Sequence, residues 1–183
     1  MIRSATYNDL TQVWQLRLET AQLLKDRKID QWQYENPSYE TIKKDIENNE
    51  FFVYEEQGVI LGMISIKSGI ERTYNVIYDG KWGYDLPYLT IHRLAVKRSL
   101  LGQTVAKELM QFAEELGKSK GIYYIRIDTH EKNRYAIRLF ESFEYIKRGW
   151  IMLDDKEGDL KRLAYDKKLK EDMHEDLDRY DNA

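Results

Sequence analysis

The sequence predicts an α/β (α+β) fold in which one mixed β-sheet carries helices on both faces. Residues 88–96 and 122–128 are rich in strand-forming residues and flank a helical pattern, and a strand–helix–strand order implies a right-handed parallel crossover. Residues 50–66 hold two β-rich runs around Gly58, which is typical of an antiparallel hairpin. A parallel crossover combined with hairpins requires a mixed sheet.

Apolar spacing and turn residues define the elements of the first half. Apolar residues recur at helical spacing over 10–24, and Asn36 with Pro37 has the form of an N-cap followed by the first helical residue. The expected elements are, in order, a strand over 2–5, a helix over 8–25, a helix from Pro37 to about Asn48, the hairpin, and an extended loop or irregular hairpin over 67–86.

The second half alternates strands and helices. Its expected elements are a strand over 88–96, a helix from Gly102 that ends before Gly121, a strand over 122–128, a helix capped by Asn133, and strands over 145–153 and 160–166. Residues 1–166 are therefore expected to form a single domain.

Residues 167–183 form a charged tail. Leu169, Met173, Leu177 and Tyr180 share one helical face, so we expect a terminal helix that docks on the domain or on a partner. A homodimer is left open.

Composition excludes several classes of protein. The 183 residues include no cysteine, which removes thiolate nucleophiles, cysteine-ligated metals and disulfides. The 29 basic and 32 acidic residues give a net charge of −3, without the basic excess that nucleic-acid binding requires. No apolar run approaches the ~20 residues of a membrane span. We therefore expect a cytoplasmic protein with no nucleic-acid or membrane partner.

Common catalytic motifs are absent from the sequence. There is no G-x-S-x-G elbow, no phosphate-binding P-loop and no G-x-G pair. A metal held by His92, Asp128 and His130 on neighbouring strands stays open, but we expect no metal. The small residues Gly102 and Ala106 open a helix directly after a strand, where free amides suit a pyrophosphate or simply begin the helix.

Two sequence patterns resemble the GNAT superfamily of N-acetyltransferases, which bind acetyl-CoA. The family pattern Q/R-x-x-G-x-G/A lies over Leu101, Gly102, Gln103, Thr104, Val105 and Ala106, after Leu94, Ala95 and Val96; Leu101 replaces the usual Gln or Arg, and Thr104 replaces a Gly. The second pattern is met by Asn133, Ala136, Leu139, Phe140, Glu141 and Tyr145. Further similarities extend to Tyr165 and indicate a bacterial branch of the family.

The resemblance implies a mostly antiparallel sheet around the parallel crossover, and a binding site for acetyl-CoA as cosubstrate. Leu94, Ala95 and Val96 are then expected to bind the pantetheine arm through their main chain. The amides of 101–106 are expected to hold the pyrophosphate. Asn133 is expected to contact the cofactor arm, or alternatively only to cap its helix.

Catalytic roles follow from the same resemblance. His92 is the candidate general base because it lies on the strand beside the thioester and histidines titrate near neutrality; the alternative is a core histidine. The family's usual acid, a Tyr, is replaced by Phe140, so Tyr135, Tyr145 or solvent would protonate the thiolate. An ordered water held by Thr90 and Asp128 is the alternative base.

Residues of the acceptor site are also implied. Gln31, Trp32 and Tyr34 border the acceptor site in such a fold, although an aromatic residue there can also cover the core. Asp128 is expected to orient the substrate, unless Arg93, Arg126 and Asp128 only form an internal Arg–Asp pair.

The sequence thus predicts an acyl-CoA-dependent N-acetyltransferase that acts on a primary amine by direct attack in a ternary complex. The acceptor is a small-molecule or peptide amine of open identity. The alternatives are a non-catalytic domain that binds CoA or a small ligand as a sensor, and a scaffold that assembles through the tail.

Overall fold

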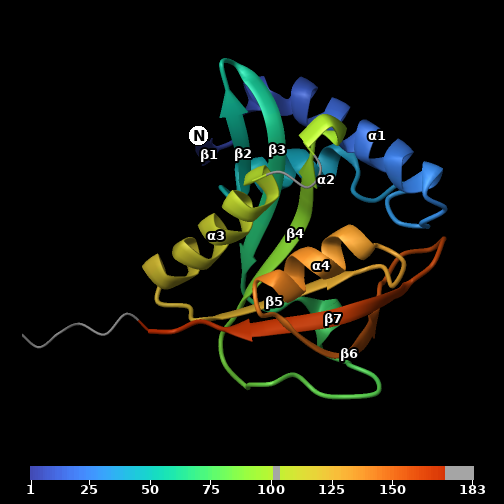
Figure 1. Cartoon of the computed structure of the whole chain (residues 1–183), viewed down its shortest axis with the longest axis vertical. Helices are drawn as coiled ribbons and strands as arrows, with labels where there is room; N and C mark the ends of the chain where they lie inside the picture. The colour runs from blue at the N-terminus through green and yellow to red at the C-terminus, as the bar shows by residue number, and fades with distance from the viewer. Residues whose placement is uncertain (101–103, 172–183) are drawn as a thin grey trace, which may run out of the picture.

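The computed structural model describes residues 1–100 and 104–171 (Figure 1). The helices in this part of the chain are α1 (Leu10–Asp26), α2 (Tyr39–Glu47), α3 (Thr104–Ser119) and α4 (Arg134–Ser142). The strands are β1 (Ile2–Ser4), β2 (Phe51–Glu56), β3 (Val59–Ser68), β4 (Leu89–Val96), β5 (Tyr124–Thr129), β6 (Ile146–Met152) and β7 (Lys161–Lys168).

The strands form one seven-stranded sheet in the order β1-β2-β3-β4-β5-β7-β6. All neighbouring strands pair antiparallel except β4 and β5, which are parallel and are joined through α3. The hairpin between β2 and β3 turns at Gln57 and Gly58, which both have positive φ, the turn geometry that matches strand twist. The predicted mixed, mostly antiparallel sheet with one parallel crossover is confirmed.

Both faces of the sheet are covered because side chains alternate along the strands. Phe51 and Val53 of β2 are buried in a cluster with apolar residues of α1 and α2. Phe52 belongs to a second cluster, which contains Leu109 of α3 and Phe140 of α4. Helices α1 and α2 therefore lie on one face, and α3 and α4 lie on the other (Figure 1).

A long loop between β3 and β4 covers part of the sheet. Tyr74, in a short 3-10 helix of this loop, is 1% exposed and packs with Ile151 and Ala164. The guanidinium of Arg126 lies between two rings from the same region, 4.4 Å from the Trp82 centroid and 4.1 Å from the Tyr88 centroid. These contacts hold the loop on β5, where it becomes one wall of the site described below.

The second helix begins later than the sequence predicts. Its N-cap is Ser38, whose side chain accepts a hydrogen bond from the Thr41 amide, and α2 starts at Tyr39. The predicted N-cap, Asn36, instead donates through its side-chain amide to Asp155, 2.5 Å away. The predicted start at Pro37 is therefore wrong, because Asn36 is used in a long-range contact.

The last strand extends beyond its predicted end at residue 166. Lys167 and Lys168 continue the pairing with β5, and Lys167 Nζ lies 2.8 Å from Glu114 on α3. Leu169, predicted to lie on the tail helix, is 4% exposed and packs in the core. The tail positions Met173, Leu177 and Tyr180 fall outside the described residues.

No helix in the described ranges is long and apolar enough to cross a membrane.

Candidate active site

The parallel strands β4 and β5 separate part of the way along their length. They pair only at 89–91 with 125–127, and beyond Ile91 strand β4 pairs only with β3. The pairing with β3 shifts register between Met63 and Ser65, and Arg93, on the opposite segment of β4, has φ of 54°. This bulge leaves the main chain from His92 onward unpaired toward β5, so a ligand can pair there as an extra strand.

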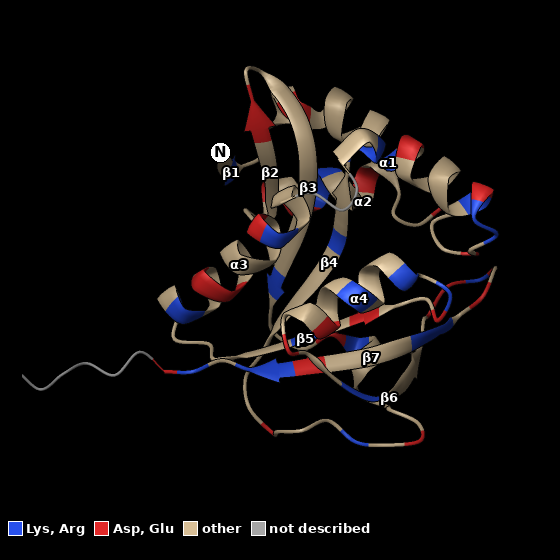
Figure 2. Ribbon diagram, in the orientation of Figure 1, with Lys and Arg blue, Asp and Glu red and all other residues tan. Residues whose placement is uncertain are grey.

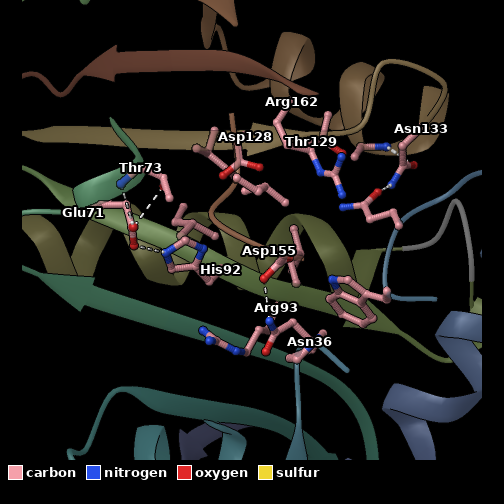
Figure 3. Close-up of a pocket in the computed structure, with 18 of the residues that line it drawn as sticks. Asn36, Glu71, Thr73, His92, Arg93, Asp128, Thr129, Asn133, Asp155 and Arg162 are labelled. Carbon is pink, nitrogen blue, oxygen red and sulfur yellow. Dashed lines mark hydrogen bonds and ion pairs between the residues drawn. The ribbon is translucent and has the colours of Figure 1, made fainter. Parts of the chain in front are cut away.

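A polar cavity of about 340 Å³ lies on one side of this opening (Figure 3). We call it the central cavity. It is lined by residues of the loop after α1, of the loop between β3 and β4, of β4 and β5, of α4, of the loop between β6 and β7, and of β7. Its lining includes Gln31, Trp32, Asn36, Glu71, His92, Arg93, Leu94, Asp128, Thr129, Asn133, Ala136, Phe140, Asp155 and Arg162.

An apolar groove of about 390 Å³ lies on the other side of the opening. It runs between the end of α1, the end of β4 and the first turns of α3 and α4. Its lining includes Leu23, Leu24, Arg27, Leu94, Ala95, Val96, Ala106, Lys107, Asn133, Tyr135, Ala136 and Arg138. The groove and the central cavity adjoin, because Leu94, Asn133 and Ala136 line both.

His92 projects from β4 into the central cavity (Figure 3). Its Nε2 lies 3.0 Å from Oε2 of Glu71, and its side chain is 23% exposed. Nδ1 points away from Glu71 toward the cavity (Figure 3). The hydrogen bond with His92 lowers the pKa of Glu71 to about 2, although partial burial opposes this shift. Sequence reasoning found His92 but not Glu71, a carboxylate in an irregular loop with no distinguishing spacing.

Asp128 projects into the cavity from β5 and forms no ion pair with an arginine of the described ranges. It accepts a hydrogen bond from the Tyr74 hydroxyl at 2.7 Å, and Arg126 donates instead to the Tyr84 carbonyl at 3.1 Å. The Arg126–Asp128 pair considered from the sequence is not formed.

Arg93 pairs instead with a carboxylate from α2. Its Nη1 lies 2.8 Å from Asp45, at ion-pair distance but without hydrogen-bond geometry. Asp45 is 1% exposed and also contacts Lys67 at 2.8 Å and Ser65 at 3.0 Å. Burial lowers the pKa of Arg93, and Asp45 opposes that shift. The residue at the bulge, Arg93, is thus linked to α2 through Asp45.

The loop after α1 closes one side of the cavity. Asn133 caps α4 by accepting a hydrogen bond from the Ala136 amide, and its side-chain amide donates to Gln31 at 3.0 Å. Trp32 lines the central cavity. Tyr34 lies beyond it, in a hollow of about 360 Å³ between this loop and the loop joining β6 and β7. That second loop carries several acidic residues (Figure 2).

Arg162 forms another part of the cavity wall. It is 5% exposed, and its Nη1 donates to the main-chain carbonyls of Asp159 and Lys161. Burial lowers its pKa, and the nearby Asp128 carboxylate opposes this shift. The inward direction of its side chain follows from its place on β7.

Two of the three remaining predicted aromatic residues line the cavity or the groove, and one does not. Phe140 lines the central cavity and Tyr135 lines the groove. Tyr145 lines neither of them; it is 3% exposed and packs in the core, and burial raises the pKa of its hydroxyl. Its ring lies instead 5.7 Å from Lys167 Nζ.

The predicted phosphate turn is described only in part. Ala106 lines the groove, Val105 is buried in the core, and Thr104 is exposed at the start of α3. Leu101, Gly102 and Gln103 lie outside the described residues.

The described part of the chain has no cluster of three or more residues that could hold a metal. His130 does not join His92 and Asp128, because its Nε2 lies 2.9 Å from Asp159 and its Nδ1 accepts from the Lys132 amide. His92, Asp128 and His130 therefore do not come together as the metal site that the sequence left open.

Three comparisons with known proteins agree on the acetyltransferase (GNAT) family. A profile of the acetyltransferase (GNAT) family matches residues 12–145. YesJ of Bacillus subtilis (strain 168), an uncharacterized N-acetyltransferase, is 30% identical over 117 residues, which are 60% of this chain and 61% of that protein. The match thus spans about three fifths of this curated relative.

Solved structures are similar over more of the chain. A GNAT-family acetyltransferase from Streptococcus agalactiae 2603 is 32% identical with a TM-score of 0.82, and the match covers 94% of this chain and 96% of that one. The PaiA N-acetyltransferase from Thermoplasma acidophilum, solved in complex with coenzyme A, is 18% identical with a TM-score of 0.67. That match covers 92% of this chain and 98% of that one, and it shows a shared fold.

Proposed function

Because the chain belongs to the acetyltransferase (GNAT) family, we propose that it transfers an acetyl group from acetyl-CoA to a primary amine within a ternary complex. The observation that carries the proposal is that an apolar groove and a polar cavity meet at the opening between β4 and β5. Two substrates that enter from opposite sides would meet at Leu94 and Ala136. Direct transfer needs this arrangement.

The groove suits the arm of acetyl-CoA. Its walls are largely apolar, and the unpaired main chain of β4 offers hydrogen bonds to the amides of an extended ligand. Arg27, Lys107 and Arg138 supply positive charge along the groove, which favours the phosphates. The thioester would then lie at the junction, beside His92 and Phe140.

His92 is the general base in this proposal. An aliphatic ammonium must lose a proton before its nitrogen can attack, and Nδ1 of His92 faces the cavity in which it would bind. The neutral nitrogen then forms a bond to the acetyl carbon, the carbon–sulfur bond breaks, and the thiolate leaves with the electron pair. The nitrogen loses its second proton as the amide forms, and a proton supplied through solvent converts the thiolate to the free thiol of CoA. The ammonium proton passes to His92 directly or through one water.

The cavity favours a cationic acceptor. Glu71, Asp128, Asp154 and Asp155 contribute carboxylates to its wall, and Trp32 contributes an apolar surface. Of the basic residues in the lining, Lys67 and Arg93 pair with the buried Asp45, and Arg162 donates to main-chain carbonyls. Carboxylates attract an ammonium group during entry, and the aromatic surface can cover its carbon chain. Acceptors of this class include polyamines, amino acids, aminoglycosides and peptide amines.

Phe140 gives the first testable prediction, because it stands where the family usually has a Tyr. The described lining near Phe140 offers no phenol to protonate the departing thiolate. We expect Phe140→Tyr to raise kcat, by up to ~10-fold, through general acid catalysis. Steady-state rates at saturating acetyl-CoA measure this effect.

Phe143→Tyr is the matched control, since Phe143 follows α4 and lines neither the groove nor the central cavity. It should leave kcat unchanged. Equal rates for Phe140→Tyr and wild type would show that thiolate protonation is not limiting, contrary to this expectation.

A sensor is the second candidate function, because Phe140 removes the usual acid while leaving a groove suited to CoA. Thermal unfolding in the presence of acetyl-CoA tests binding. It therefore distinguishes the enzyme and the sensor, which both bind acetyl-CoA, from a scaffold, which does not. At a hundredfold excess over Kd, acetyl-CoA should stabilise the protein by about 2.7 kcal/mol and raise Tm by about 5–10 °C. An unchanged Tm in millimolar acetyl-CoA would contradict both the enzyme and the sensor.

A further inference from the structure

Glu71 is held in place independently of His92. Its Oε1 accepts hydrogen bonds from the Thr73 amide at 3.3 Å and from the Thr73 hydroxyl at 3.0 Å. Its main-chain amide donates to the Tyr88 hydroxyl at 2.9 Å. Oε2 is therefore presented to His92 in a fixed position, at 3.0 Å from Nε2 (Figure 3).

The charge of Glu71 decides the direction of this hydrogen bond. With a pKa of about 2 the carboxylate is ionised at neutral pH and can only accept. Nε2 must therefore carry the ring proton, and the lone pair lies on Nδ1. A neutral imidazole in this tautomer has its basic nitrogen on the cavity side.

Other charged and titratable groups surround His92. No other carboxylate in the described ranges lies at ion-pair distance from the ring. The groups that share its cavity or pack beside it are Lys67, Tyr74, Arg93, Asp128, Asp154, Asp155 and Arg162.

We propose that Glu71 is a positioning residue that fixes His92 in the tautomer able to accept the amine proton and stabilises the imidazolium formed by that transfer. The proposal rests on the proposed acetyl transfer, in which His92 is the base. Glu71 does not touch the acceptor in this account; it acts through His92.

The substitution Glu71→Gln tests the tautomer directly. The Thr73 amide must still donate to an oxygen, so the carboxamide oxygen takes the place of Oε1 and the NH₂ group faces Nε2. An NH₂ donor at Nε2 moves the ring proton to Nδ1, where the base is needed. We expect kcat/KM to fall by at least ~10²-fold.

Glu71→Ala should be less damaging than this isosteric change. Without a partner the ring samples both tautomers, and we expect a loss of only ~10-fold. Because the carboxylate that favours the imidazolium is gone, the lower limb of the kcat/KM profile should move to lower pH. A purely structural role predicts the opposite order, since the isostere would then be the milder change.

Glu55→Gln is the matched control. Glu55 is 24% exposed against 25% for Glu71 and also binds a basic partner, Arg3, but it lies on β2 away from the cavity. Its substitution should leave kcat/KM and the pH profile as in wild type.

Ring-nitrogen NMR of the ligand-free protein gives a readout that does not depend on activity. His92→Gln identifies the His92 signals by their loss. We expect the proton on Nε2 in wild type and on Nδ1 in Glu71→Gln. A wild-type ring protonated on Nδ1, or the same tautomer in both proteins, overturns the proposal.

Activity provides two further tests. The proposal is also overturned if Glu71→Gln retains wild-type kcat/KM. It is equally overturned if the Glu71 variants lose all activity while His92→Gln stays active, because Glu71 would then be the base. If wild type transfers no acetyl group to any amine, the proposed function fails, and the NMR result still decides the role of Glu71.

Discussion

Replacing His92 by Gln is expected to lower kcat/KM by about 10²-fold and to abolish the lower limb of its pH profile. Glutamine keeps the size and hydrogen-bonding capacity of the ring but cannot accept a proton. In wild type, kcat/KM should rise with pH along this lower limb, because only the neutral ring is a base. Profiles of both proteins with one amine measure the effect.

His130→Gln is the control for a histidine with a structural role. His130 is 2% exposed, forms a hydrogen bond with Asp159 and lines neither the groove nor the central cavity. Its substitution should lower Tm and leave the shape of the pH profile unchanged. If His92→Gln behaves like His130→Gln, with a lower Tm and an intact lower limb, His92 is a core histidine and not the base.

Ala136→Trp should weaken acetyl-CoA binding by about 10²-fold, with a parallel loss of kcat/KM. Ala136 lines both the groove and the central cavity, so an indole at this position fills the junction in which the thioester would lie. The penalty corresponds to about 2.7 kcal/mol, within the range for overfilling a packed site. Calorimetric titration with acetyl-CoA measures the change.

Glu141→Trp provides the comparison on the same helix. Glu141 is exposed on α4 and lines neither the groove nor the central cavity, so its substitution should change acetyl-CoA affinity by less than about 2-fold. Wild-type affinity in a folded Ala136→Trp protein would mean that acetyl-CoA does not pass between β4 and α4.

Sequence patterning predicted the elements because the periodicity of apolar residues is local. The hairpin around Gly58 and the Asn133 cap depend on residues close together in the chain. The parallel pair follows from the strand–helix–strand order over 88–128. Asn36 shows the limit of such reasoning. Its sequence context favours an N-cap, but a hydrogen bond to Asp155, 119 residues away, uses its side chain instead.

The positions that line the central cavity were predictable where a strand or helix fixes the direction of a side chain. His92, Asp128 and Phe140 line it from β4, β5 and α4. Glu71 and Asp45 were not predictable, because they reach His92 and Arg93 from a loop and from α2. Tyr145 was proposed from its type, but the core contacts that turn it away from the cavity leave no sequence signal.

Acetyl transfer itself is the most direct test of the proposed function. Purified protein is incubated with acetyl-CoA and each member of a panel of polyamines, amino acids, aminoglycosides and peptide amines, and free thiol and acetylated product are both measured. The proposal predicts at least one primary amine for which thiol release depends on the amine and equals the N-acetylated product. Thermal stabilisation by acetyl-CoA without product from any amine in the panel would contradict it and identify the protein as a sensor.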